Sequence, residues 1–311
     1  MRKMLHILIV LSVIVLLGSC SANSKDTVES ESSSLTGFDR SANILVKKPV
    51  ADEELALYSP EMRRIYDQGE LRVAMVSNER TPFFYQDSNG NLIGHDVDLA
   101  TDMADKFGVR IRFIRTAKSF DEVVDQVVNG QVDVAVSKLS ATLSRAKKVS
   151  FSNPYMTLHQ GVLINRLALA KIGTGHQNPL GLLQKSRSAI GVIAGTSYVE
   201  YAKEWFPSAE VVSFQSIDEA MDAALEGDIS AIFYDELQLK QLIKSNPGHN
   251  IDLQLQLIPE RVDPLAIAVS SKEPVLLAWI NLYLESNRAW ISGLSMKYDI
   301  QLSDSSNVKN K

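Results

Sequence analysis

The chain contains 311 residues, of which 45% are hydrophobic, and its 32 Lys and Arg residues against 37 Asp and Glu residues give a net charge of −5. Proteins that bind phosphate backbones need clustered basic residues, so this acidic balance argues against a nucleic-acid partner. The single cysteine, Cys20, excludes an internal disulfide.

The N-terminus has the layout of a secretory signal. Arg2 and Lys3 supply a positive start, residues 4–17 are almost entirely apolar, and small residues follow. This apolar run is shorter than the roughly 20 residues that a membrane-spanning helix needs. A short uncleaved anchor is the alternative interpretation.

The tetrapeptide Leu17-Gly18-Ser19-Cys20 at the end of this run resembles the lipobox of bacterial lipoproteins. In that motif a lipid is attached to the cysteine thiol, and cleavage leaves the cysteine as the new N-terminus. A cysteine at this point by chance is the competing interpretation. The resemblance implies a signal peptide over residues 1–19 and lipidation of Cys20. The mature protein would then be extracytoplasmic, anchored in the cell membrane or the outer membrane, and periplasmic in a two-membrane cell.

A polar segment and a helical pattern follow. Residues 20–50 are rich in serine and poor in large apolar residues, which predicts a flexible tether. From about Asp52 to Gln68 the spacing predicts a helix that Gly69 ends. Its inner residues are expected to be Leu55, Leu57, Met62 and Ile65.

Short β-branched runs then alternate with helical patterns in two series. The first series has strands at 71–76, 111–114 and 132–136 and helices at 97–107 and 120–128. The second has strands at 189–193, 211–214 and 229–233 and helices at 198–205 and 217–225. This alternation predicts an α/β fold with mainly parallel sheets.

Two segments connect the series, and a helical region closes the chain. The sequence passes from the first series through residues 154–163 and returns through residues 264–269. A final helical stretch from Pro274 to Met296 carries Trp279, Tyr283 and Trp290, which we expect to pack in the core.

Five motifs, in order along residues 69–300, together resemble the type 3 extracellular solute-binding proteins that deliver polar amino acids to ABC importers. They are Gly69–Val73, Pro82-Phe83, Gly94–Leu99, Asp133–Arg145 and Phe151–Tyr155. The resemblance implies the two-lobed type II periplasmic-binding-protein fold, with a ligand in the cleft between lobes joined by two crossover segments. Lobe 1 would comprise residues 51–158 and 264–311, and lobe 2 residues 159–263.

The resemblance assigns the carboxylate clamp to the end of the fourth motif. Arg145 falls where the family binds the ligand's α-carboxylate, and a guanidinium matches a carboxylate with two parallel donors. A surface salt bridge is the competing interpretation. Thr142 and Ser140 fall where a hydroxyl or a backbone N–H completes that site, although either could be an ordinary turn residue.

The second series supplies the other side of the expected cleft. Gly195-Thr196 follows a strand and opens a helix, so free backbone N–H groups there could face an anion, while a plain helix cap is the alternative. Asp235 falls where the family pairs an acidic residue with the ligand's α-amino group. A buried carboxylate of this kind could sense its ligand, because it is stable only beside a cation.

The side-chain pocket is expected to involve Phe83 and Phe120, which fall at aromatic positions of the family, with core packing as the alternative. Arg80 stands in a charged loop, Asn78–Thr81, where the family has small or aromatic residues. Lys138 also replaces a usual glycine. These departures predict a polar or charged ligand.

The sequence therefore predicts an extracytoplasmic binding protein, not an enzyme, that captures a small polar ligand, an amino acid, and delivers it to an ABC permease. We expect a monomer with no cofactor and no metal site. A membrane sensor or regulatory module of the same fold is the first alternative. A dehydratase acting on prephenate or arogenate is the second, but those enzymes place a glutamate where this chain has Tyr198.

Overall fold

A computed structural model describes residues 50–173, 178–249 and 251–302. The predicted signal peptide, the lipidation site Cys20 and nearly all of the predicted tether lie outside the described residues. Within those three ranges, no helix is both long enough and apolar enough to cross a bilayer.

The first half of the fold is built on a five-stranded sheet with the order β4-β1-β5-β12-β6. The strands are β1 (Glu70–Val76), β4 (Arg110–Ala117), β5 (Val134–Ala135), β6 (Val149–Phe151) and β12 (Ala268–Ser270). Strand β1 pairs parallel with β4 and β5, whereas β12 pairs antiparallel with β5 and β6. A short hairpin, β2 (Tyr85–Gln86) with β3 (Leu92–Ile93), follows β1.

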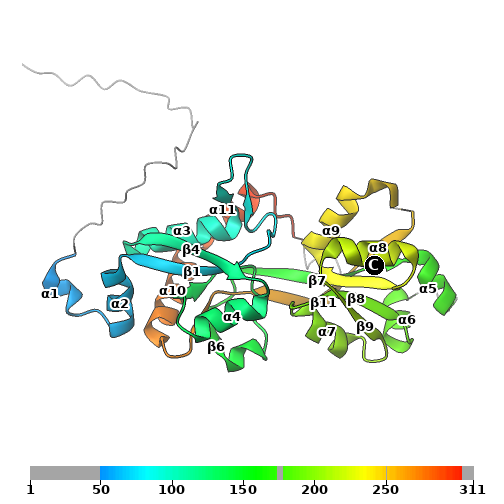
Figure 1. Cartoon of the computed structure of the whole chain (residues 1–311), viewed down its shortest axis with the longest axis horizontal. Coiled ribbons are helices and arrows are strands. Elements are labelled where there is room, and N and C mark those ends of the chain that lie inside the picture. The colour runs from blue at the N-terminus through cyan, green and yellow to red at the C-terminus, as the bar shows by residue number, and fades with distance from the viewer. Residues whose placement is uncertain (1–49, 174–177, 250, 303–311) are drawn as a thin grey trace, which may run out of the picture. The chain divides into compact units, whose positions relative to one another are not determined.

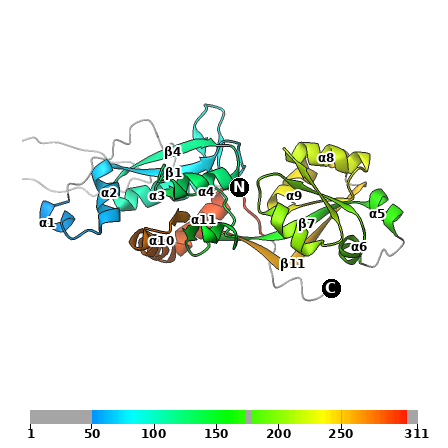
Figure 2. The same cartoon turned by 60° about the horizontal axis from the view of Figure 1, so that its bottom comes forward.

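Helices bury the apolar residues of this sheet in two clusters. One cluster joins β1 to helices that include α2 (Pro60–Gln68), α3 (His95–Phe107), α10 (Pro274–Ser286) and α11 (Arg288–Lys297). The other joins the same sheet to α4 (Phe120–Val128). Figure 2 shows α3 between strands β1 and β4 on one side and helices α10 and α11 on the other.

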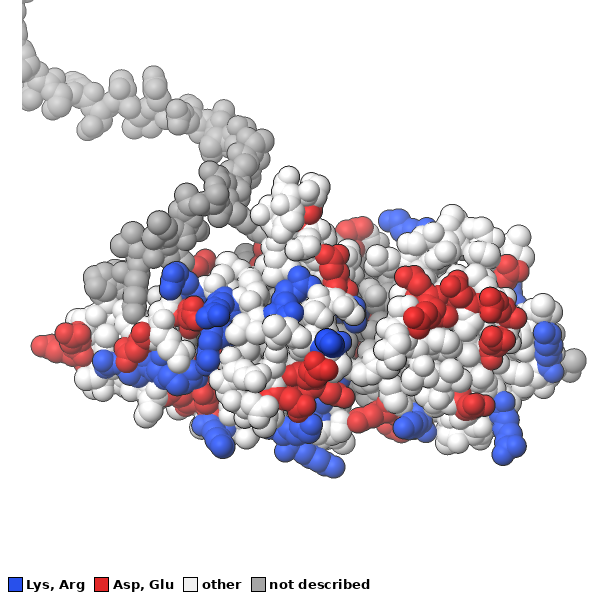
Figure 3. All heavy atoms as spheres, viewed as in Figure 1, with Lys and Arg blue, Asp and Glu red and all other residues white. Residues whose placement is uncertain are grey.

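The second sheet has the order β11-β7-β10-β8-β9 (Figure 1). Its strands are β7 (Met156–Asn165), β8 (Ala189–Ile193), β9 (Glu210–Phe214), β10 (Ala231–Asp235) and β11 (Leu253–Leu265). Its helices are α5 (Arg166–Ile172), α6 (Pro179–Lys185), α7 (Tyr198–Trp205), α8 (Ile217–Glu226) and α9 (Glu236–Ser245). Exposed acidic residues of α8, including Asp218, Glu219 and Asp222, gather on the surface shown in Figure 3.

Strands β7 and β11 connect the two sheets. They pair antiparallel from Met156 opposite Leu265 to Asn165 opposite Leu253. At the Leu265 end, the two strands contact the segments that connect the strands of the first sheet. Tyr155 N donates to Leu265 O at 3.0 Å, and Ser140 forms an isolated antiparallel β-bridge with Leu265. The α/β fold with two sheets is confirmed. The lobe boundaries at residues 158/159 and 263/264 stay a prediction.

Both sheets are mixed, not mainly parallel as the alternation predicted. Strands β7, β11 and β12 belong to the connecting segments and enter their sheets antiparallel. The alternation of strand and helix patterns predicts parallel pairing only for strands joined through a helix. It gives no information on the direction of a strand that returns to the sheet through a connecting segment.

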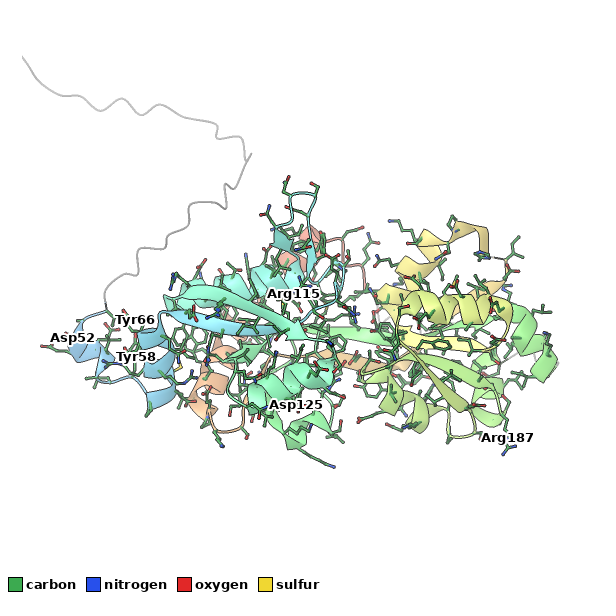
Figure 4. All side chains as sticks on the ribbon, in the orientation of Figure 1. Asp52, Tyr58, Tyr66, Arg115, Asp125 and Arg187 are labelled. Atoms are coloured by element: carbon green, nitrogen blue, oxygen red, sulfur yellow. The ribbon has the colours of Figure 1, made fainter. Side chains whose placement is uncertain are left out.

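The predicted helix over 52–68 is two helices, α1 (Asp52–Leu55) and α2. Ser59 caps α2 by accepting a hydrogen bond from Met62 N, and Pro60 occupies the first helical turn, where no backbone donor is needed. The prediction that Leu57 is an inner residue is wrong, because it lies in the break and is 84% exposed. Tyr58, in the same break, packs edge-on against Tyr66 of α2 (Figure 4).

The final helical stretch is also divided, at Asn287, into α10 and α11. Trp279 stacks on Tyr283 with the ring planes 9° apart and meets Phe107 edge-on, so both α10 aromatics pack as predicted. Trp290 does not, because the new helix turns it outward and leaves it 40% exposed.

Candidate functional site

The connection after β1 is fixed by Arg115 of β4, which Figure 4 labels. Arg115 Nη2 donates to Ser77 O at 2.6 Å, and its guanidinium lies 5.8 Å from the centre of the Phe84 ring. From helix α9 in the second half of the fold, Gln238 Nε2 donates to Thr81 O at 3.2 Å. Held at both points, the charged loop places the Arg80 guanidinium 5.6 Å from the centre of the Phe120 ring.

The Gly94–Leu99 motif supports the neighbouring connection after β5. Gly94 has φ 136°, and a Cβ at this position would lie 2.2 Å from Phe83 O, so only glycine fits. The side chain of Asp96 is fully buried and accepts hydrogen bonds from Lys138 N at 2.6 Å and the Tyr155 hydroxyl at 3.0 Å. Asp96 therefore fixes the backbone at Lys138.

Lys138 is the residue that most alters the expected site. Its Nζ lies 2.6 Å from Asp235 Oδ2, and both side chains are buried. The same ammonium lies 5.2 Å from the centre of the Phe83 ring and 5.3 Å from that of Tyr234. Sequence reasoning recognised Lys138 as a replacement for glycine but did not place its side chain against Asp235.

Arg145 is buried and makes its hydrogen bonds within the first half of the fold. Its Nε and Nη2 donate to Asp121 Oδ1 at 3.2 and 3.1 Å, and its Nη1 donates to Ser140 O at 3.2 Å. The guanidinium lies 5.9 Å from the centre of the Phe120 ring. Thr142 Oγ1 accepts from Arg145 N at 3.3 Å, at the start of the short 3₁₀ helix Arg145–Lys147.

Gly195 and Thr196 lie at the contact between the two halves. Gly195 has φ 70°, and a Cβ there would lie 2.9 Å from Ser119 Cβ, so the glycine permits this close approach. The expectation of a free N–H at Thr196 is wrong, because Thr196 N donates to Ile193 O at 3.3 Å and its hydroxyl donates to the same oxygen at 2.7 Å. Both donors serve the turn between β8 and α7.

Asp235 caps α9 and pairs with Lys138. Its Oδ1 accepts from Gln238 N at 3.1 Å, as a helix cap does, while Oδ2 faces the ammonium. One carboxylate oxygen therefore caps the helix, and the other pairs with the lysine.

A second buried carboxylate, Asp263 of β11, was not predicted. It accepts from Ser140 Oγ at 3.0 Å and lies 3.3 Å from the Tyr198 hydroxyl and 3.5 Å from the Tyr201 hydroxyl. Burial raises the pKa of Asp263 to about 6, and the hydrogen bond from Ser140 offsets only part of that effect. The only signal in the sequence was an acidic residue directly before the apolar run 264–269.

Residues of both halves surround one small cavity. Its lining is Phe120, Lys138, Ser140, Thr196, Ser197, Tyr198, Tyr234, Asp235 and Asp263. The cavity measures about 10 Å³, which is room for about one water molecule. Ser197 Oγ also donates to Ser140 Oγ at 2.9 Å across it. A larger cavity of about 540 Å³ lies elsewhere, beside Tyr155, Arg288 and Ile291.

The structure brings most of the predicted site residues together. Phe120, Ser140, Thr196 and Asp235 line the cavity, and Gly195 adjoins it. Arg80 and Arg145 do not line the cavity but contact the ring of Phe120, and Thr142 accepts a hydrogen bond from Arg145 N. Phe83 is fully buried, does not line the cavity and contacts Lys138, which does. Their roles in ligand binding stay predictions.

In the described part of the chain, no group of three or more His, Cys, Asp or Glu side chains could hold a metal ion. The polar groups at the cavity are hydroxyls, carboxylates and one ammonium, which bind a polar organic molecule by hydrogen bonds and charge.

Comparison with known proteins agrees with this geometry. The profile of the bacterial extracellular solute-binding proteins, family 3, matches residues 71–298, and the chain belongs to that family. The ABC transporter arginine-binding protein 1 of Escherichia coli is 28% identical over 221 residues, covering 69% of this chain and 84% of that protein. The arginine-binding periplasmic protein of Mannheimia haemolytica is 27% identical over 213 residues, or 66% and 80%.

Solved structures show the same fold. An ancestral amino acid-binding protein, a precursor of cyclohexadienyl dehydratase, superposes with a TM-score of 0.62 at 28% identity, covering 76% of this chain and 98% of that one. An ancestral arginine-binding protein bound to arginine has a TM-score of 0.59 at 27% identity, covering 74% and 98%. The type II periplasmic-binding-protein fold is confirmed.

Proposed function

We propose that this protein captures a small polar solute with a carboxylate group, an amino acid or a close chemical relative of one, between its two halves. One observation carries the proposal: the cavity is lined by Phe120 and Ser140 from one half and by Thr196 and Asp235 from the other. The cavity of about 10 Å³ has no room for such a solute, so the halves must separate to admit one, and a solute held between these residues would contact both halves. The relatives' names, which specify amino acids, support the ligand class.

Binding by two halves favours closure around the solute. Hinge closure of two domains around a ligand is the motion known for periplasmic binding proteins. The closed form would then dock on an ABC permease, which the membership of the family supports. No chemical step is needed, and Tyr198 stands where a dehydratase would have its glutamate, with its hydroxyl directed at Asp263.

The lipid anchor is a further part of this proposal. Residues 1–19 and the Cys20 motif support secretion and thiol lipidation, which would keep the protein beside its permease. Labelling of cells with a fatty-acid analogue tests it. The wild type should incorporate the label and remain in the membrane fraction, and Cys20→Ala should do neither, whereas equal labelling of both would refute the anchor.

A thermal-shift screen of the purified protein tests the binding function. A ligand at 100 times its dissociation constant stabilises the folded state by about 2.7 kcal/mol, which moves the melting temperature by several degrees. The panel should contain amino acids, their 2-oxo and 2-hydroxy analogues, and neutral sugars as controls. A shift confined to one carboxylate class is the expected result, while shifts only with sugars would contradict the proposal.

A further inference from the structure

The backbone at Lys138 points to a special role for its side chain. Its φ of 49° lies in the left-handed region, which glycine adopts easily and residues with a side chain adopt only when other contacts compensate. The bond from Lys138 N to Asp96 Oδ2 holds the backbone there. A lysine in this conformation therefore needs a further contact that glycine could not make.

The side chain of Lys138 makes this contact with its ammonium group, which is buried beside Asp235 and two aromatic rings. Lys138 Nζ lies 2.6 Å from Asp235 Oδ2, and the two side chains are only 4% and 1% exposed. Its ammonium lies over the faces of the Phe83 and Tyr234 rings, 5.2 and 5.3 Å from their centres, within the range of cation–π attraction. A carboxylate with aromatic faces around it is the environment that a ligand ammonium would require, and here the protein's own cation fills it.

We propose that Lys138 is the resident counterion of Asp235, and that the site therefore prefers small carboxylates without an α-amino group, such as 2-oxo acids, over the matching α-amino acids. This inference rests on the proposed function and narrows its ligand class. An amino acid would have to displace Lys138 from Asp235 or place a second ammonium beside it. Like charges at such distances repel strongly when both are buried.

The cationic side of the site agrees with an anionic ligand. The guanidinium groups of Arg80 and Arg145 lie 5.6 and 5.9 Å from the centre of the same ring, Phe120. Among the described residues, Arg80 Nε is a buried donor with no hydrogen-bond partner. Arg145 pairs with Asp121, whose side chain is 63% exposed, so a ligand carboxylate can replace that partner without burying an unpaired acid.

Asp263 is the other acceptor that an ammonium could use. Within the described ranges it makes no ion pair, but its hydrogen bond from Ser140 and the nearby hydroxyls of Tyr198 and Tyr201 already occupy its oxygens. Lys138 also lies close enough to favour its charged form. Replacing Asp263 by asparagine would weaken an amine bound there and leave the Lys138–Asp235 pair in place, which separates the two possibilities.

Calorimetry with matched pairs of ligands tests the inference. The probes are pyruvate with L-alanine and 2-oxoglutarate with L-glutamate, titrated into the wild type, Lys138→Gly and Lys138→Met. Lys138→Gly suits the left-handed backbone and vacates the ammonium position, whereas Lys138→Met removes the charge and keeps the bulk. Lys148→Ala, which removes an exposed lysine nearby, is the matched control.

The wild type should bind one oxo acid at least tenfold more tightly than its amino acid. Lys138→Gly should reverse that preference by at least tenfold, Lys138→Met should weaken oxo-acid binding without restoring amino-acid binding, and the control should keep the wild-type ratio within twofold.

Tighter binding of the amino acid by the wild type, with the ratio unchanged in Lys138→Gly, would overturn the inference and leave the proposed function intact. If Asp263→Asn then abolished the amine preference, the ammonium would belong to Asp263. Failure of every probe to bind both the wild type and Lys138→Gly, each shown to be folded by circular dichroism, would overturn the inference, whereas the thermal-shift screen with its wider panel decides the proposed function.

Discussion

Two buried carboxylates, Asp133 and Asp263, show how differently the fold treats a charge in its scaffold and a charge at its cavity. Asp133 accepts bonds from Arg72 N, Nε and Nη2 at 2.8, 3.1 and 2.8 Å, and a further bond from Arg64. Within the described part of the chain, the side-chain groups that donate hydrogen bonds to Asp263 are all hydroxyls, from Ser140, Tyr198 and Tyr201.

Their pKa values move in opposite directions. Burial alone would raise the pKa of Asp133, but the hydrogen bonds from Arg72 and Arg64 outweigh it and lower the pKa below the usual value. Burial raises the pKa of Asp263 to about 6. Guanidinium partners keep a buried carboxylate ionised at neutral pH, whereas hydroxyl partners leave its pKa raised towards neutral pH. Carboxylates with a raised pKa are common at functional sites.

The largest effect should come from breaking the scaffold site. Asp133→Ala leaves two guanidinium groups and a backbone N–H without their shared acceptor, so we expect the free energy of unfolding to fall by about 4 kcal/mol, within the range for breaking a buried ion pair. Urea denaturation measures it. A loss below about 1 kcal/mol would show that water replaces the carboxylate at Arg64 and Arg72.

At the cavity, Arg145→Ala should reduce ligand affinity by about 3 kcal/mol if Arg145 clamps a carboxylate, the loss expected for a buried charged hydrogen bond. Calorimetry with the best ligand from the thermal-shift screen measures the loss. The neighbouring exposed Lys147 is the control, and Lys147→Ala should bind normally. Equal affinities for both variants would remove Arg145 from the binding site.

Asp263 should give the next effect, and it should depend on pH. Because its folded pKa is raised, its contribution to stability is complete below its unfolded pKa near 4 and is lost as the pH rises through about 6. Asp263→Asn cannot ionise, so the variant should gain about 2 kcal/mol of unfolding free energy relative to the wild type between pH 4 and pH 7. Urea unfolding across that range measures the difference, and a constant difference would contradict the raised pKa.

The smallest effect should come from an exposed pair. Lys148 Nζ lies 3.1 Å from Oδ1 of Asp125, the residue labelled on α4 in Figure 4, and both side chains of the pair are more than half exposed. Lys148→Ala should change the free energy of unfolding by less than about 0.5 kcal/mol, because water and salt screen such pairs. A loss above about 1 kcal/mol in urea denaturation would contradict this explanation. It would mean that burial does not account for the larger stability contribution of Asp133 compared with the exposed pair.

The sequence predicted the start of α4 and the end of α2 correctly, where the chain carries caps, but it missed the cap at Ser59 that begins α2. Ser119 accepts from Glu122 N at the start of α4, and Gly69 takes the left-handed conformation at the end of α2. These signals work because a cap and its helix are only a few residues apart. The predictions failed at Leu57 and Trp290, where breaks in the predicted helices redirected the side chains.

Short motifs in a fixed order were enough to identify the family, the two-sheet α/β fold and part of the cavity lining, namely Phe120, Ser140, Thr196 and Asp235. The partners of these residues became known only from the three-dimensional structure. Lys138 and Asp235 lie on different sheets' connections, 97 residues apart, and Asp263 reaches the same cavity from a returning strand. The energy of an ion pair depends on the distance between the two charges and on their burial, and the spacing of residues along the chain predicts neither.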